Sequence, residues 1–290
     1  KQKGDNLKLG IVMEGGASRT VFSCGVADCL LEEQIMPDYF IGVSAGIAYG
    51  VSYLSGQKGR NLQLIEEFMS DKRYMGIKYL FNRKMKSFYN IPFVFDEVPN
   101  KLLPFDYEAF AAYKGEAEAV VTNIKTGKAE YFPVPRDNKD FSVIMASCSL
   151  PILFQPVKIG KKYYLDGGVS DSIPFQRAFE KGCDKVIVVL TRTRDYVKKA
   201  EKAGKAASTL YHRYPKLVES LKNRPEAYNQ CIKELRRAEK AGKVFVLAPE
   251  DMMGVGRTEA SAEKLRKLYQ QGYYQTKESM HALRLYLEEP

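Results

Sequence analysis

Histidine is scarce in this chain of 290 residues, which contains only His212 and His281. So few histidines argue against a His-rich metal site. Cysteine occurs five times, an odd number, and never in a C-x-x-C spacing. The sequence therefore favours neither a disulfide framework nor a zinc site, and a reducing compartment such as the cytoplasm fits it best. We expect no cofactor and no metal, calcium included, because the carboxylates do not cluster at ligand spacing.

Long apolar segments are missing as well. No run approaches the ~20 residues that a membrane-spanning helix needs. Residues 1–6 are polar and lack the apolar segment of a secretory signal, so we expect none. Hydrophobic residues make up 45% of the chain and charged residues 28%, which is typical of a folded domain and excludes general disorder.

The charge is unbalanced, with 45 Lys and Arg against 35 Asp and Glu, a formal net charge of +10. Such an excess is either a solvated basic surface or a face that attracts nucleic acid or anionic lipid. No nucleic-acid-binding motif is present, so we expect no nucleic-acid partner. Basic and aromatic residues alternate between Lys72 and Tyr89. We therefore hypothesise that Lys72 to Lys86 helps the protein contact an anionic membrane as a peripheral protein.

The order of apolar runs indicates the fold class. A strand is predicted over 9–13, an amphipathic helix over 20–34, a strand over 39–41 and a helix over 45–54. Strand, helix, strand, helix is the pattern of a parallel sheet covered by helices. The sequence thus predicts an α/β fold, a three-layer sandwich whose mostly parallel central sheet has helices on both faces.

Further elements follow the same logic. A β-ribbon is predicted over 119–132, a helix over 141–147, short strands at 157–159 and 163–165, a helix over 173–181 and a buried strand over 185–190. Residues 196–242 are expected to be mostly helical, 243–247 a strand and 260–287 one long helix. We divide the chain into a catalytic core at 7–195 and a mostly helical extension with one further strand at 196–290, packed on the core.

Ser44 lies in the pattern Gly42-x-Ser44-x-Gly46, between an apolar strand and a helix. A nucleophilic serine on a sharp strand-to-helix turn needs small neighbours, because the backbone there is crowded and strained. The helix N-terminus then favours negative charge that develops beside the serine. A strand–helix turn without chemistry is the alternative interpretation.

Two other glycine-rich segments carry possible chemistry. Gly15, Gly16 and Ala17 lie in the segment Glu14 to Arg19 after the first strand, where successive backbone N–H groups can bind an anion and Arg19 adds a cation. A dinucleotide fingerprint is absent from this loop. Asp166 is followed by two glycines at the end of the strand at 163–165, where α/β sheets place functional groups.

These segments, in this order, resemble the patatin-like phospholipase family, as does Ala146-Ser147-Cys148-Ser149-Leu150-Pro151 before the Asp-Gly-Gly strand. The resemblance runs from about Leu7 to Leu190, and the helical C-terminal part is similar to an extension found in bacterial members. Four motifs in the right order are much more specific than any one of them.

The resemblance implies a serine acyl hydrolase, a phospholipase A, lysophospholipase or lipid esterase of lipid degradation. Ser44 is then the nucleophile and Asp166 its base, without a histidine, and an acyl-enzyme forms on Ser44. Gly15, Gly16 and Ala17 form the oxyanion hole, supported by Arg19, and the partner is a phospholipid or other acyl ester. One departure is Ala17, where the family usually has a third glycine, because alanine tolerates positive φ less well.

Two alternatives stay open at this point. The order Ser44, Asp166 and then His212 or His281 also permits a Ser–His–Asp hydrolase, although Ser44 follows only the second strand, which is early for that fold. The other alternative is a catalytically weak lipid-binding protein on the same fold. Hydrolase and transacylase share the acyl-enzyme step, and the sequence does not separate them.

Overall fold

The protein is described here from a computed structural model, which covers residues 7–82, 85–137, 139–200 and 204–288. The polar segment at residues 1–6 lies outside the described residues. So do Arg83 and Lys84 of the basic segment named above.

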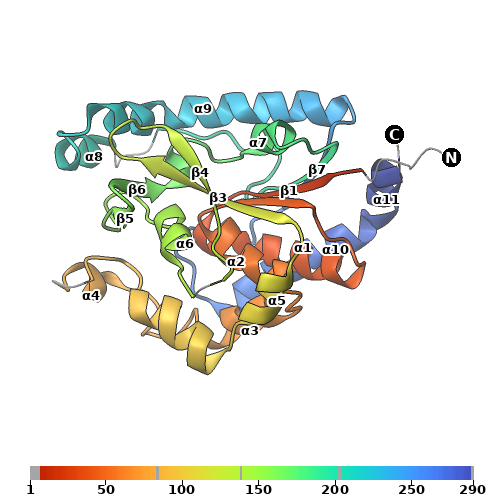
Figure 1. The fold of residues 1–290 in the computed structure, drawn as a ribbon, viewed down its shortest axis with the longest axis horizontal. Helices are drawn as coiled ribbons and strands as arrows, with labels where there is room; N and C mark the ends of the chain where they lie inside the picture. Colours follow the sequence, from red (N-terminus) through yellow and green to blue (C-terminus); the bar gives the residue numbers. More distant parts are fainter. Residues whose placement is uncertain (1–6, 83–84, 138, 201–203, 289–290) are drawn as a thin grey trace.

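One sheet of eight strands lies at the centre of the described chain, in the order β5-β6-β3-β2-β1-β7-β8, with β4 also paired to β3 (Figure 1). The strands are β1 (Leu9–Met13), β2 (Tyr39–Val43), β3 (Glu116–Asn123), β4 (Ala129–Pro133), β5 (Val157–Ile159), β6 (Lys162–Asp166), β7 (Lys185–Val189) and β8 (Val244–Leu247). The run β3-β2-β1-β7-β8 is parallel, and β4, β5 and β6 add antiparallel pairs. The sheet is therefore mixed, with a parallel main part.

Strand β3 has three partners, and their register positions the site described below. β2 pairs with residues 116–120 of β3, and β6 pairs with residues 121–123. β4 pairs with residues 118–122, which overlap both of these ranges. Because a strand has two edges, β4 occupies one edge, and β2 and β6 follow one another along the other.

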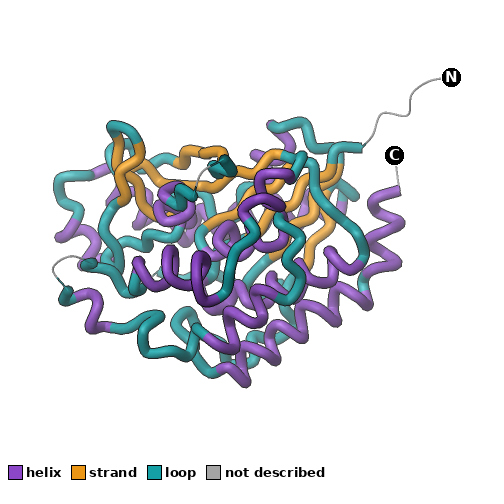
Figure 2. Tube along the Cα trace, turned by 60° about the horizontal axis from the view of Figure 1, so that its bottom comes forward, coloured by secondary structure: helices purple, strands orange, loops and turns teal. Residues whose placement is uncertain are grey.

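Helices cover both faces of the sheet, which confirms the expected three-layer α/β fold (Figures 1 and 2). In Figure 1, α7 and α9 lie above the sheet, and α1, α2 and α10 lie below it. The helices are α1 (Val21–Glu32), α2 (Ala45–Leu54), α3 (Arg60–Glu67), α4 (Ile77–Leu80), η2 (Phe93–Leu102), α5 (Tyr107–Ala112), α6 (Ser142–Ser147), α7 (Phe175–Glu180), α8 (Gly204–Leu210), α9 (Pro215–Lys240), α10 (Ala262–Glu278) and α11 (Met280–Glu288), with the short turns η1 (Ala17–Thr20) and η3 (Gly167–Val169).

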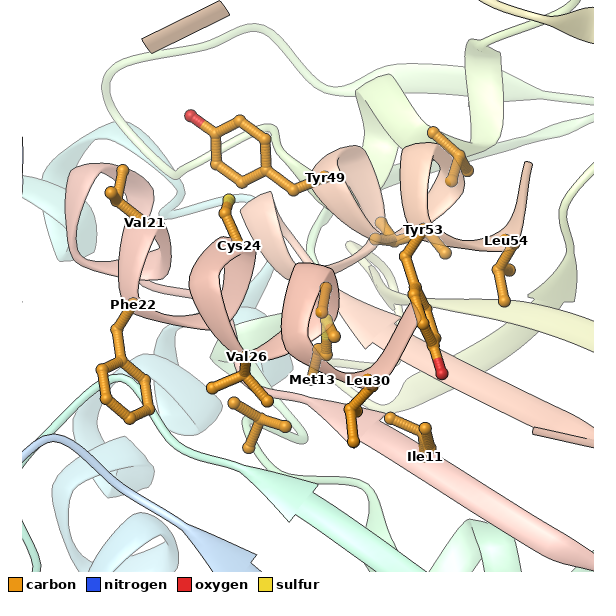
Figure 3. Packing of buried hydrophobic residues seen from close by; sticks show 14 of the residues in the cluster. Ile11, Met13, Val21, Phe22, Cys24, Val26, Leu30, Tyr49, Tyr53 and Leu54 are labelled. Atoms are coloured by element: carbon orange, nitrogen blue, oxygen red, sulfur yellow. The ribbon is translucent and has the colours of Figure 1, made fainter. Parts of the chain in front are cut away.

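Alternate side chains of β1 enter two different hydrophobic cores. Ile11 and Met13 pack with α1 and α2 on one face of the sheet (Figure 3), whereas Val12 packs on the other face with α7 and α9. All three are buried. A strand buried on both faces must be apolar throughout, which explains its uninterrupted apolar sequence.

Helix α1 differs from the amphipathic helix expected over 20–34, because residues 21–30 are all buried. Helix α10 covers the face that the sequence assigned to solvent, and even Asp28 is only 2% exposed. Its carboxylate accepts hydrogen bonds from the Tyr269 hydroxyl at 2.5 Å and the Gly59 N–H at 3.0 Å. A buried carboxylate is tolerated when it is hydrogen-bonded in this way, so its charge did not indicate an exposed face.

The single helix expected over 260–287 was also wrong, since the structure has α10 and α11, separated at Ser279. The Thr276 hydroxyl donates to the carbonyl of Gly272 at 2.7 Å, one turn earlier. Such back-bonding often bends helices, and it lies one turn before the interruption. None of the helices in the described ranges is both long and apolar enough to cross a membrane.

Candidate active site

Ser44 occupies the turn between β2 and α2, with φ 54° and ψ −127°. Positive φ at a residue other than glycine is strained by roughly 1–3 kcal/mol and persists only when its surroundings impose it. Two contacts impose this conformation on Ser44. A Cβ at Gly46 would lie 2.3 Å from the Met13 carbonyl oxygen, so only glycine fits, and the Ser44 N–H donates to Ser147 Oγ at 2.8 Å. The sharp turn predicted from the sequence is present.

Asp166 ends β6 beside this turn. Val43 pairs with Val120 of β3, and Asp166 pairs with the next residue, Val121. Asp166 therefore lies one step beyond the end of β2 on the same edge of β3, at the level of Ser44. Its N–H donates to the Ser149 carbonyl at 2.8 Å, so the segment Ala146 to Pro151 before β6 holds the backbone of both Ser44 and Asp166.

Asp166 as a whole residue is 1% exposed. One oxygen, Oδ1, accepts a hydrogen bond from the Gly168 N–H at 2.8 Å, whereas Oδ2 has no hydrogen-bond partner among the described residues. Burial raises the pKa of Asp166 above its ordinary value, and the nearby Ser44 hydroxyl and Arg224 cation counteract part of that rise. A buried carboxylate with an unused oxygen next to a serine hydroxyl can accept a proton from it.

The loop of Gly15, Gly16 and Ala17 lies against Ser44, and a Cβ at Gly15 would approach Ser44 Cβ to 2.7 Å. Within the described chain, the backbone N–H groups of these three residues donate to no other group. Unused N–H groups beside a serine hydroxyl can bind an oxyanion. The structure thus brings the loop, Ser44 and Asp166 to one pocket.

Ala17 adopts φ 51°, the left-handed region that glycine occupies without cost. The neighbouring Gly16 has φ −170°, an extended conformation open to any residue. The strain at this loop therefore falls on the one position where alanine replaces the expected glycine. An L-residue pays about 1–2 kcal/mol for this conformation.

Two ionisable side chains flank the loop. Glu14 is buried and accepts hydrogen bonds from the Thr191 N–H at 2.7 Å and the Tyr228 hydroxyl at 2.9 Å, and burial raises its pKa. Arg19 is 7% exposed, and its Nε has no hydrogen-bond partner in the described part of the chain. Burial, together with repulsion from Arg192 and Arg257, lowers the pKa of Arg19 to about 10.

An apolar pocket of about 120 Å³ opens from Ser44. Its walls come from α2, from α3, from the segment between Tyr74 and Phe105, and from α6 with the residues beside it. Apart from Ser44, its polar groups are Arg60 and three tyrosines. The lining residues that argue most directly for an apolar ligand are Ala45, Ala48, Val94, Phe95, Val98, Ile144, Met145 and Phe154. Such a pocket suits an alkyl chain.

Several residues of the site were missed from the sequence. Arg224 on α9 donates from Nε to the Gly168 carbonyl at 2.5 Å, and the Arg257 carbonyl accepts the Ser18 N–H at 3.2 Å. The carbonyl of Glu259 accepts the Ser18 hydroxyl at 2.8 Å. Nothing local marks these residues, because an arginine in a polar helix or loop is ordinarily solvated.

Both histidines lie away from this site. His212 and His281 are exposed, and neither lines a pocket that Ser44 lines. No cluster of His, Cys, Asp or Glu in the described chain is arranged to hold a metal ion. The five cysteines are all unpaired.

Comparison with known proteins gives two family matches. A family model described as patatin-like phospholipase matches residues 11–179. A second model, described as a domain of unknown function (DUF6363), matches residues 214–288.

Similar proteins include the uncharacterized protein YjjU of Escherichia coli K12, 23% identical over 188 aligned residues that cover 63% of this chain and 52% of YjjU. Lysophospholipase NTE1 of Cryptococcus neoformans var. neoformans is 28% identical over 195 aligned residues, covering 63% of this chain and 11% of NTE1. The chain thus spans about half of YjjU and a small part of NTE1. Among solved structures, VipD from Legionella pneumophila covers 96% of this chain and 67% of VipD, with 13% identity and a TM-score of 0.48.

The raised pKa of Asp166 has a consequence for stability. Between its unfolded and folded pKa values the folded state binds more protons, so ionisation of Asp166 reduces stability as pH rises. Asp166→Asn removes this loss while keeping an acceptor for the Gly168 N–H. We expect its free energy of unfolding to match wild type at low pH and to exceed it increasingly as pH rises, measured by urea unfolding from pH 4 to 8.

Asp71→Asn is the matched control, because hydrogen bonds from Arg73 lower the pKa of Asp71. Its stability difference has the opposite sign, a deficit at neutral pH that disappears as pH falls through the folded pKa of Asp71. A pH-independent difference for Asp166→Asn would show that its carboxyl is not perturbed.

The strain at Ala17 can be measured by Ala17→Gly. Glycine relieves the positive φ but loses backbone entropy, so we expect no net loss and up to ~1 kcal/mol of gain in the free energy of unfolding. Ala227→Gly, at an exposed position inside α9, is the comparison and should lose about 1 kcal/mol. Equal losses in both variants would contradict strain at Ala17.

Proposed function

The patatin-like phospholipase model matches more than half of the chain, so the protein belongs to that family, and from this premise we propose that it is a serine acyl hydrolase that cleaves lipid esters with a Ser44–Asp166 dyad. The observation that carries the proposal is the buried Asp166 carboxylate, whose Oδ2 has no partner among the described residues although the Ser44 hydroxyl is its neighbour.

The reaction follows from these positions. Ser44 Oγ attacks the acyl carbonyl carbon while its proton passes to Asp166. The resulting oxyanion accepts hydrogen bonds from the N–H groups of Gly15, Gly16 and Ala17, supported by the Arg19 charge. The alcohol leaves with the proton from Asp166, and an acyl-Ser44 ester remains. Water then attacks that ester, Asp166 takes the water proton and returns it to Ser44 Oγ, and the carboxylic acid is released.

A carboxylate is a weak base unless its surroundings favour the protonated form. Burial of Asp166 does so, since it raises the pKa and lowers the cost of proton transfer from serine. The unused Oδ2 also leaves room for that proton. The dyad therefore needs no histidine, which is consistent with the exposed positions of His212 and His281.

The apolar pocket supports a lipid acyl chain as the part of the substrate that is transferred. Ser44 lies at the point where this pocket meets the glycine-rich loop, so a chain inside it would present its ester carbon to the hydroxyl. The five unpaired cysteines favour a cytoplasmic enzyme.

The segment around α4 supports peripheral contact with a membrane. It lies at the edge of the molecule (Figure 1), and two of its apolar side chains are unusually exposed, Ile77 at 65% and Phe81 at 81%. Lys72, Lys78 and Lys86 of the same segment are also exposed. Exposed apolar side chains in a lysine-rich segment suit insertion between anionic headgroups. Tyr74 and Tyr89, from the same segment, line the apolar pocket, so a docked α4 would lie close to this pocket.

The dyad is tested by Ser44→Ala, Asp166→Asn and the double variant His212→Ala/His281→Ala. On a short-chain p-nitrophenyl ester and a lysophospholipid, we expect the first two to lose at least roughly 10³-fold in kcat. The histidine variant should keep wild-type activity. A fluorophosphonate probe should label wild type and not Ser44→Ala.

Loss of activity in the histidine variant would instead favour a Ser–His–Asp triad. A folded wild-type protein that neither hydrolyses nor labels would favour the lipid-binding alternative. Full activity in Asp166→Asn would exclude Asp166 as the base.

Membrane contact is tested by Ile77→Ser/Phe81→Ser. Burial of two large apolar side chains contributes roughly 3 kcal/mol, so vesicle binding should weaken by about 100-fold. Leu285→Ser, an exposed apolar residue on α11, is the control and should bind normally. Cosedimentation with vesicles of increasing anionic lipid content is the measurement, and binding that ignores both the double substitution and lipid charge would contradict the idea.

A further inference from the structure

Ser44 also lines a second, smaller pocket of about 40 Å³ whose character is opposite to that of the first. The two pockets share only Ala17, Ser44 and Leu150. Five cationic side chains line the second pocket, against the carboxyls of Glu14 and Asp166. The cations are Arg19, Arg192, Lys198, Arg224 and Arg257. We call this the basic pocket.

Arg19 is the residue that most requires a ligand. It is more than nine-tenths buried, and its Nε has no partner in the described chain. The charges of Arg192 and Arg257 repel it, and Glu14 only partly offsets them. A buried guanidinium normally has a carboxylate or phosphate on its fork of N–H groups. Beside Arg19, the place of that anion can be taken by a molecule that enters the basic pocket.

Two of the other cations, Arg192 and Lys198, are held by contacts with aromatic rings. The Arg192 guanidinium lies 4.3 Å from the centre of the Tyr196 ring, and Lys198 Nζ lies 5.1 Å from that of Tyr228. The backbone of Lys198 makes two hydrogen bonds with Asn229 of α9. Cations held in this way form a prepared anion site, because little side-chain entropy is lost when the anion binds.

The two carboxyls in the pocket do not make it suitable for a cation. Glu14 accepts hydrogen bonds from Thr191 and Tyr228, and Asp166 from Gly168. Five cations against these two groups repel a quaternary ammonium and attract a phosphate.

The basic pocket has apolar surface on two sides. One is the apolar pocket at Ser44. The other is a larger pocket of about 370 Å³ beyond Leu150, walled by Pro151, Ile152 and Leu153, which also shares Lys198, Arg224 and Arg257. A phosphate compound without alkyl chains would leave both apolar surfaces empty. The arrangement favours an amphiphile, with its charge between two apolar parts.

We propose that the basic pocket binds the phosphate of the substrate and selects lipid esters with a net anionic headgroup over zwitterionic choline lipids. The proposal rests on the acyl hydrolase function inferred above. With the acyl chain in the apolar pocket and its ester at Ser44, the alcohol part of the ester extends into the basic pocket. Arg192 and Arg257 are the specificity-determining residues, since they line the pocket with Arg19, their charges act on it, and they lie outside the glycine-rich loop.

The test compares headgroups on one acyl chain. Short-chain lysophosphatidic acid and lysophosphatidylcholine, dissolved as monomers, are supplied to wild type and to Arg192→Gln/Arg257→Gln. We expect wild type to show the higher kcat/KM for lysophosphatidic acid. The double variant should lose at least about 10-fold of this preference, as for a lost hydrogen bond to a charged group.

Arg213→Gln/Lys216→Gln removes two exposed charges near the start of α9 and is the control for net charge. It should keep the wild-type preference. The proposal is overturned if wild type prefers the choline lipid, if Arg192→Gln/Arg257→Gln leaves the preference unchanged, or if the control loses it equally.

Binding of the two lipids and of inorganic phosphate to Ser44→Ala is measured by calorimetry. Because this variant lacks the Ser44 hydroxyl, the measurement tests the headgroup preference independently of hydrolysis. Lysophosphatidic acid should bind more tightly than lysophosphatidylcholine and than inorganic phosphate, and Arg192→Gln/Arg257→Gln in the same background should weaken it. Inorganic phosphate binding as tightly as the lipid would assign the pocket to a soluble compound and overturn the proposal. If wild type hydrolyses no ester, the hydrolase function fails, and the calorimetry still decides the pocket.

Discussion

The site depends on one backbone arrangement, the succession of β2 and β6 along a single edge of β3. Val43 pairs with Val120, and Asp166 pairs with Val121. Because of this register, the end of one strand meets the end of another, and a serine and an aspartate far apart in the chain become neighbours. No long or flexible side chain is needed to bring them together. A slip of β6 by one residue would turn the Asp166 side chain to the opposite face of the sheet and separate it from Ser44.

Unfavourable features of the fold gather at the same place. The described chain has seven buried polar side-chain atoms without a hydrogen-bond partner, and the two that belong to ionisable groups are Asp166 Oδ2 and Arg19 Nε. Both residues line the pocket beside Ser44, where Ser44 and Ala17 also hold positive φ. Strain and unsatisfied groups normally destabilise a protein and are found where function requires them. Their coincidence supports a reactive and ligand-binding site more strongly than any single motif.

The sequence predicted the parts that depend on local pattern. Apolar runs gave β1, β2 and β7, and small residues around Ser44 gave the sharp turn, since both follow from nearest neighbours in the chain. It did not predict that Asp28 is buried, because the hydrogen bond from Tyr269 comes from a helix at the other end of the chain. From the local sequence alone, the charge of Asp28 predicts a solvated helix face. The packing of α10 on α1 buries that face instead.

The basic pocket was hidden from the sequence for the same reason. Arg192 follows a strand, Arg224 lies in a helix and Arg257 lies in a loop. No common spacing in the sequence links them. Each looks like a surface arginine until the fold brings the three to Ser44. In the composition these arginines appear only as part of the +10 net charge. A net charge does not show where the cations lie in the fold.

The chain positions of these residues suggest how the proposed work is divided. The family model covers residues 11–179, which include Ser44, Asp166 and the glycine-rich loop. The three arginines lie beyond it, and Ser18 of the loop is held by the carbonyls of Arg257 and Glu259. Strand β8 extends the sheet beside β7, so the later segment is joined to the same core. The shared segment then supplies the reaction, whereas the segment after it fixes the loop and supplies the charges that would choose the headgroup.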